Sequence, residues 1–178
     1  MLQKFTAPDG SANDNFGLSV ALNDGTAAIG FRVDDENGSV SGSAYLFDTT
    51  TGSLLQKFTA PDGSPYDSFG YSVALSGNTA AIGFRVDDEN GSVSGSAYLF
   101  DTTTGSLLQK FTAPDGSAND QFGLSVALND RTALIGSLVD DENGSVSGSA
   151  YLFETITGSL LQNLPHPTVL LTTTSDYQ

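Results

Sequence analysis

Three short acidic segments carry the clearest potential for chemistry. Each places two aspartates and a glutamate in a row before Asn-Gly, and the segments lie 53 positions apart. Carboxylate oxygens are ligands that Ca²⁺ prefers. The nine candidate ligands are Asp34, Asp35, Glu36, Asp87, Asp88, Glu89, Asp140, Asp141 and Glu142. Loops that wrap an ion usually space their ligands by two, whereas these are consecutive. We therefore favour a solvated connection ending in an Asn-Gly turn, with Ca²⁺ binding as the alternative.

The segments before three Phe-Gly pairs vary between copies and are candidates for ligand contact. They span residues 11–15, 64–68 and 117–121, and their variable positions include Asn13, Tyr66 and Asn119, of which Tyr66 alone is aromatic. Each segment also holds an aspartate, namely Asp14, Asp67 or Asp120. A short aspartate in such a place is typically an acceptor for backbone N–H groups. We expect this structural role rather than catalysis.

The sequence contains no recognisable catalytic set. The one histidine, His166, stands between two prolines, and cysteine is absent, so a His/Cys zinc cluster within one chain is excluded. There is no nucleophile elbow with a suitable partner, no phosphate-binding loop and no dinucleotide fingerprint. We therefore expect no enzymatic activity, no catalytic residue and no cofactor other than the Ca²⁺ considered above.

Composition and charge limit the partners. The 178 residues are 38% hydrophobic, which suffices for one domain with a core, and the net charge is −15. So acidic a chain is a poor ligand for nucleic acids or anionic membrane surfaces. The apolar runs are only a few residues long, which predicts no membrane-spanning helix. Because the first residues already belong to a repeat, we expect no signal peptide in this chain, and the absence of cysteine fits either redox compartment.

The elements that position these segments recur with the same period. In the first copy we expect short strands at residues 16–22, 26–31, 43–48 and 53–60, separated by turn residues such as Asn23-Asp24-Gly25. No window has a sustained helical period. In the third strand, alternate residues place apolar groups on both faces of the sheet. Such a sheet must be covered on both sides, as a propeller blade is.

Four strands in each period of about 40–50 residues predict an all-β fold, a β-propeller of four-stranded antiparallel blades with three blades per chain. A β-solenoid is the main rival, although its repeats are usually shorter. We expect blades at residues 9–60, 61–113 and 114–164, a stray outer strand at 1–8 and a divergent tail at 165–178.

Three blades are too few to close a ring, and the apolar ends of the stack should drive association. We therefore expect a homodimer that closes a six-bladed ring. A fourth strand that begins at Ser159 is expected to break at residues 163–167, so residues 1–8 of one chain are expected to complete the last blade of its partner.

The repeats resemble the FG-GAP repeat family, the units of the integrin α-subunit propeller and of many bacterial surface proteins. The first copy carries the resemblance at Asp14 to Leu22, Ala27 to Gly30 and Gly42 to Phe47. Two departures stand out. The Gly-Ala-Pro element is replaced by Gly30-Phe31-Arg32, and the turn between the first two strands is too short for the family's Ca²⁺ loop. That metal site is therefore not carried over.

The resemblance implies a non-enzymatic binding, adhesion-type or scaffolding module with a protein or glycan ligand on its loops, and it favours an extracellular or cell-surface location. Two alternatives stay open. One is a purely structural repeat protein, recently amplified or engineered to self-assemble without a specific ligand, because the copies are nearly identical. The other is a fragment of a larger surface protein, enzyme or longer propeller, or a chain that packs with another FG-GAP chain.

Overall fold

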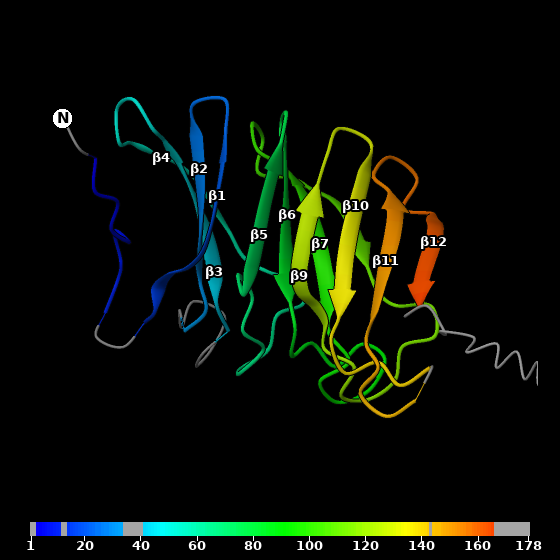
Figure 1. Ribbon diagram of the computed structural model, residues 1–178. Coiled ribbons are helices and arrows are strands. Elements are labelled where there is room, and N and C mark those ends of the chain that lie inside the picture. The colour runs from blue at the N-terminus through cyan, green and yellow to red at the C-terminus, as the bar shows by residue number, and fades with distance from the viewer. Residues whose placement is uncertain (1–2, 12–13, 34–40, 143, 166–178) are drawn as a thin grey trace, which may run out of the picture.

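A computed structural model describes residues 3–11, 14–33, 41–142 and 144–165. These residues form three four-stranded antiparallel sheets and, within the described part of the chain, no helix. Each sheet consists of strands that are consecutive in the sequence and paired in sequence order, and the sheets stack side by side along the chain (Figure 1). This is the predicted propeller architecture, with three blades per chain.

The strand bounds repeat from blade to blade. Blade 1 contains β1 (Phe16–Asn23), β2 (Thr26–Phe31), β3 (Ser43–Asp48) and β4 (Leu54–Phe58). Blade 2 contains β5 (Ser72–Ser76), β6 (Thr79–Phe84), β7 (Ser96–Asp101) and β8 (Leu107–Phe111). Blade 3 contains β9 (Phe122–Leu128), β10 (Thr132–Ser137), β11 (Ser149–Glu154) and β12 (Leu160–Pro165). The second and third strands of blade 1 have the bounds that the sequence predicts, whereas β4 is shorter at both ends.

The last strand corrects one expectation. β12 does not break at Asn163. It pairs with β11 as far as Pro165, which lies opposite Ser149. A proline is tolerated there because β12 is the outermost strand of its sheet, so its outer edge needs no N–H donor. Residues 166–178, which hold His166 and most of the predicted tail, lie outside the described residues.

The N-terminal segment joins no sheet within the described part of the chain, although residues 1–8 were expected to be a strand. It lies on blade 1, where the ring of Phe5 packs against Phe47 with centroids 5.1 Å apart. Phe58 packs against Phe100 of blade 2 at the same distance, 5.1 Å. The N-terminal segment therefore packs against blade 1 in the same way as β4 and the residues that follow it pack against blade 2.

The hydrophobic cores lie between the blades. Strands β1, β5 and β9 pack beside one another, while β4, β8 and β12 form the outer edges of the sheets. The core between blades 1 and 2 joins small residues of blade 1, such as Ala28 and Ala44, to a cluster of aromatic rings from blade 2 that includes Phe69 and Tyr98. The core between blades 2 and 3 repeats this pattern. Blade 2 thus has apolar partners on both of its faces, whereas blades 1 and 3 each have a neighbouring blade on one face.

No helix in the described ranges has the length and apolar character needed to cross a membrane.

Candidate functional site

In blade 2, Asp87 and Glu89 of the predicted acidic segment contact a lysine, Lys110, together with Asp62 of the preceding linker. The Lys110 ammonium lies 2.7 Å from Asp62, 3.2 Å from Asp87, and within ion-pair distance of Glu89. Asp88 instead accepts a hydrogen bond of 2.7 Å from the backbone N–H of Val93. Desolvation lowers the pKa of Lys110, but the hydrogen bonds to Asp62 and Glu89 outweigh it and raise this pKa. The side chain therefore stays charged. The protein itself provides a cation for these carboxylates.

The corresponding acids of the other blades are only partly described. Asp34, Asp35 and Glu36 lie outside the described residues. In blade 3 the carboxylate of Asp140, 5% exposed, accepts a hydrogen bond of 2.5 Å from the Tyr151 hydroxyl. Asp141 and Glu142 are exposed. Among the described residues, no three His, Cys, Asp or Glu side chains are grouped so as to hold a metal. The Ca²⁺ site stays a prediction.

The aspartates before the Phe-Gly pairs have the expected structural role. Asp120 accepts a hydrogen bond of 2.6 Å from the backbone N–H of Ser117, and Asp14 and Asp67 accept equivalent bonds from Ser11 and Ser64. Burial raises the pKa of Asp67 to about 6, and the nearby charges of Asp87, Asp88 and Asp62 add to the effect.

Among the described residues, the predicted ligand-facing segments 64–68 and 117–121 lie at the same edge of the blades as the acidic residues 87–89 and 140–142 (Figure 1). The N–H of Asn119 donates to Ser92 of the long loop of blade 2, at 2.8 Å. Tyr66 is 66% exposed, and both Tyr66 and Asn119 have a φ of 76°. Asn13 lies outside the described residues. The edge of the blades that carries these loops therefore combines an exposed aromatic ring with carboxylates.

The Phe-Gly pairs make the contacts that join one blade to the next. The N–H of Phe69 donates to Ser41 of blade 1, and that of Phe122 donates to Ser94 of blade 2, both at 2.9 Å. A Cβ on Gly30 would lie 2.0 Å from the carbonyl oxygen of Gly70, so only glycine permits this approach. The arrangement recurs between Gly83 and Gly123, also at 2.0 Å.

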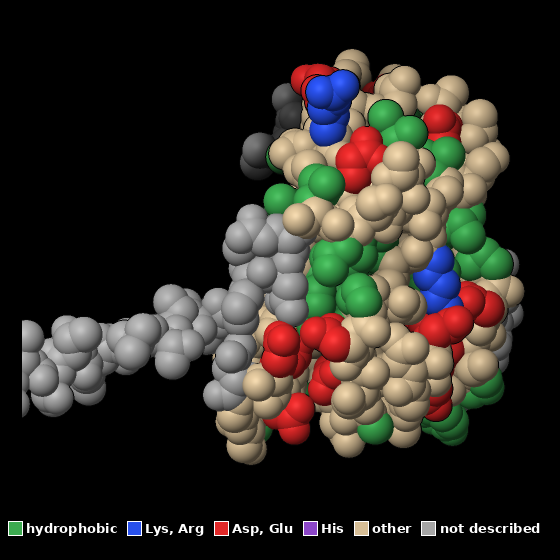
Figure 2. Space-filling view, turned by 90° about the vertical axis from the view of Figure 1, so that its right-hand side faces the viewer, with side chains coloured by type: hydrophobic (Ala, Val, Ile, Leu, Met, Phe, Trp, Pro, Cys, Tyr) green, Lys and Arg blue, Asp and Glu red, His purple; other side chains and the backbone are tan. Residues whose placement is uncertain are grey.

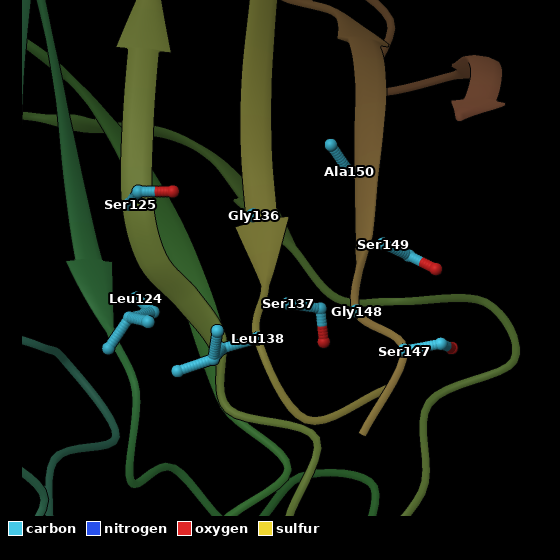
Figure 3. Close-up of a pocket in the computed structure, with 9 residues that line it drawn as sticks. All are labelled: Leu124, Ser125, Gly136, Ser137, Leu138, Ser147, Gly148, Ser149 and Ala150. Atoms are coloured by element: carbon cyan, nitrogen blue, oxygen red, sulfur yellow. The ribbon is translucent and has the colours of Figure 1, made fainter. Parts of the chain in front are cut away.

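At the blade 3 end, the residues that would receive a further Phe-Gly pair are open. They line a cavity of about 380 Å³ and include Ser125, Gly136, Leu138, Gly148 and Ser149 (Figure 3). We call this cavity the Phe-Gly socket. The three atoms nearest to a Cβ on Gly136 would all belong to Ser125 of the same blade. Hydrophobic side chains gather in the middle of this face, with acidic side chains below them (Figure 2).

At the blade 1 end, residues that blades 2 and 3 bury are exposed. Val20 is 68% exposed, whereas its equivalent Val73 is 8% exposed. Leu22 is 77% exposed, whereas its equivalent Leu75 packs against the core between blades 1 and 2. A Cβ added to Gly17 would have no atom within 4 Å, whereas a Cβ on the equivalent Gly70 would lie 2.1 Å from the carbonyl oxygen of Ser43. The two ends of the stack thus present the two halves of the contact that joins its blades.

The apolar ends were expected from the sequence, but the Phe-Gly socket was not. The available signal was the repeat itself, because Gly136 and Gly148 correspond to Gly30 and Gly42. What the sequence does not reveal is that these glycines face the Phe-Gly pair of the next blade.

Comparison with known proteins agrees with this architecture. A family model described as FG-GAP repeat matches residues 2–47, 53–100 and 106–153. The chain belongs to the FG-GAP repeat family. Among curated proteins, no sequence matches this FG-GAP chain significantly.

Several solved structures resemble the FG-GAP chain in fold. The computationally designed Ika4 protein has a TM-score of 0.60 at 16% identity, over 93% of this chain and 82% of that protein. The designed Ika8 protein has a TM-score of 0.55 at 16% identity, over 83% of this chain. BamB from Moraxella catarrhalis has 0.53 at 20% identity, over 88% of this chain. The chain spans 36% of Ika8 and 38% of BamB, and at these identities the likeness concerns the fold alone.

Proposed function

We propose that this chain is a non-enzymatic scaffolding and binding module that becomes a complete propeller when two copies join their open ends. One observation carries the proposal: residues exposed at the two ends are the equivalents of residues buried between the blades, as the contrast of Val20 with Val73 illustrates. Two copies bring six blades, within the usual range for a closed ring, and two-fold symmetry is the commonest symmetry of oligomers.

The contacts expected at each junction follow from the internal ones. Phe16 and Gly17 of one copy would enter the Phe-Gly socket of the other, with the Phe16 N–H donating to Ser147 as Phe69 donates to Ser41. Ser125 would donate to the Gly17 carbonyl, as Ser72 donates to that of Gly123 at 2.9 Å. Val20 would pack near Leu134, because Val73 and Ala28 share a core.

A pair of charge variants tests this assembly. Val20→Lys and Leu134→Glu each place a charge where an apolar contact is expected, so each variant alone should sediment as a monomer. In a mixture, one junction is unmodified and the other pairs the lysine with the glutamate. The mixture should therefore contain dimers.

A matched control is Leu108→Glu on the outer strand β8. Leu108 is 49% exposed, and its equivalents Leu55 and Leu161 are 46% and 54% exposed, so this position faces solvent in every blade. The control should sediment as the unmodified protein does. Dimers of either single variant that are as stable as the unmodified dimer would contradict the proposal.

The binding function is proposed for the edge of the blades that carries the predicted ligand-facing loops, such as residues 64–68. Tyr66 supports it, because an exposed aromatic ring among polar residues is a common contact for protein and glycan ligands. A glycan and protein array probed with the unmodified chain and with Tyr66→Ala tests this part. Loss of a specific signal in the variant is expected. A chain that binds nothing on the array would favour the purely structural alternative.

A further inference from the structure

Blades 1 and 2 each carry a cluster of a lysine, an aspartate and a tyrosine. In blade 1, Lys57 of β4 lies 2.8 Å from Asp9, and the Tyr45 hydroxyl donates to the same carboxylate at 2.6 Å. In blade 2, Lys110 and Tyr98 contact Asp62 at 2.7 and 2.6 Å. Burial would raise the pKa of Asp9, but the hydrogen bonds from Lys57 and Tyr45 lower it. The lysine of the outer strand thus ties that strand to the linker preceding its own blade.

Blade 3 has the aspartate and the tyrosine but not the lysine. The Tyr151 hydroxyl oxygen lies 2.8 Å from Asp115 and 2.5 Å from Asp140, so the two carboxylates share its one proton. Burial, followed by these two hydrogen bonds, raises the pKa of Tyr151, so the hydroxyl remains a donor. Opposite Tyr151 on β12 stands Asn163, where the other two blades have Lys57 opposite Tyr45 and Lys110 opposite Tyr98. An asparagine brings no positive charge to this place.

The N-terminal segment carries the lysine that β12 lacks. Lys4-Phe5-Thr6 repeats Lys57-Phe58-Thr59, whereas β12 has Asn163-Leu164-Pro165 there. The family match begins at residue 2 in the first unit and at residue 53 in the second, so this segment belongs to a repeat as β4 does. Its position on blade 1 is already that of a repeat, because Phe5 and Asp9 make the contacts of Phe58 and Asp62.

We propose that in the closed dimer the N-terminal segment of each copy replaces β12 as the outer strand of the other copy's blade 3. This inference rests on the proposed closure of the ring. Lys4 then lies opposite Tyr151 and pairs with Asp115 and Asp140 of the second copy, while Gln3 lies opposite Leu152, as Gln56 lies opposite Leu46. The junction is thereby built from the same residue types as the two internal junctions, and the second copy contributes the missing lysine.

The exchange costs little backbone hydrogen bonding, because one outer strand replaces another in the same register. What changes is the set of side chains. Lys4 brings a cation to acids in a chain whose net charge is −15. This difference favours the N-terminal segment over β12.

Two double cysteine variants distinguish the competing strands, since the chain has no cysteine of its own. Directly opposed residues of antiparallel strands are close enough for a disulfide. Gln3→Cys with Leu152→Cys should give a covalent dimer after mild oxidation, seen on a non-reducing gel. Leu152→Cys with Gln162→Cys closes within one chain only where β12 stays in place, so its cross-linking should be the weaker of the two. Leu46→Cys with Gln56→Cys, an internal pair of the same register, is the positive control.

The charge contact has its own test. Lys4→Gln should weaken the dimer about tenfold, since one lysine, with its contacts to Asp115 and Asp140, is lost at each of the two junctions. Asn163→Lys gives β12 the missing charge and should reduce the Gln3–Leu152 cross-link. A dimer whose Leu152–Gln162 pair closes within each chain, without the intermolecular cross-link, would overturn the exchange and leave the closed ring intact. A monomer would overturn both.

Discussion

At the scale of single residues, the linker loops hold side chains in an unusual backbone conformation. Tyr66 and Asn119 occupy equivalent positions with the same φ of 76°. Asparagine visits this left-handed region readily, whereas tyrosine does so at a cost. Tyr66 gains little packing in return, because it is 66% exposed. A strained, exposed aromatic residue at a variable position is consistent with a role in contacting a ligand.

Replacing this tyrosine should stabilise the fold. Tyr66→Asn is expected to raise the free energy of unfolding by about 1 kcal/mol, because the strain at positive φ is relieved. The matched change Asn119→Tyr should lower it by a similar amount. Urea denaturation measures both. Equal stability of the two variants would contradict the strain argument.

The raised pKa of Asp67 predicts a pH-dependent contribution to stability. Its pKa is about 6 in the folded chain, above the ordinary aspartate value. The folded state therefore binds a proton more readily than the unfolded state between about pH 4 and 6, and this group's contribution falls as the pH rises through that window. Asp67→Asn keeps an acceptor oxygen for the Ser64 N–H without the charge. The variant should gain stability relative to the unmodified chain from pH 4 to pH 7, as followed by thermal melting. A difference that does not vary with pH would refute the assignment.

At the scale of elements, the Phe-Gly junction requires glycine only where a further blade follows. Gly83→Ala places a Cβ 2.0 Å from the carbonyl oxygen of Gly123. It should destabilise the fold by about 3 kcal/mol, since neither backbone can move freely. In Gly136→Ala the closest atom to the new Cβ is the movable hydroxyl of Ser125, at 2.4 Å, and the next two lie at 3.7 and 3.8 Å, so the monomer should be almost as stable. It should still block association, because the socket receives a backbone. Denaturation and sedimentation of the two variants measure the contrast. A dimer of unchanged strength for Gly136→Ala would show that the socket is not the junction.

The sequence predicted the strands well because each ends at strong turn signals. The Asp48 carboxylate, for example, accepts N–H bonds from Thr50 and Thr51 and closes β3 onto β4. It predicted the end of β12 poorly, because a proline breaks a paired strand but is tolerated at an outer edge. The cluster around Lys110 was not predicted either. It brings together Asp62 of the linker before blade 2, Asp87 and Glu89 of the loop between β6 and β7, and Lys110 of β8. Only the folding of the blade makes these three segments neighbours.

At the scale of the whole molecule, the three blades are best understood as an open stack whose two ends are complementary. Every internal junction pairs a Phe-Gly backbone with a glycine-lined face, and the stack ends with one unused half of each kind. An apolar surface such as that of Val20 and Leu22 is costly to leave in water. A second copy would cover both ends at once, whereas an open chain of copies would leave two ends exposed.

The molar mass of the purified, unmodified chain in solution distinguishes a closed dimer from a single open stack. Sedimentation equilibrium over a range of concentrations should give twice the 18.4 kDa of one chain, with no larger species. Higher and growing masses would indicate an open filament rather than a closed ring. A mass of 18.4 kDa at all concentrations would contradict the central claim that two copies complete the propeller.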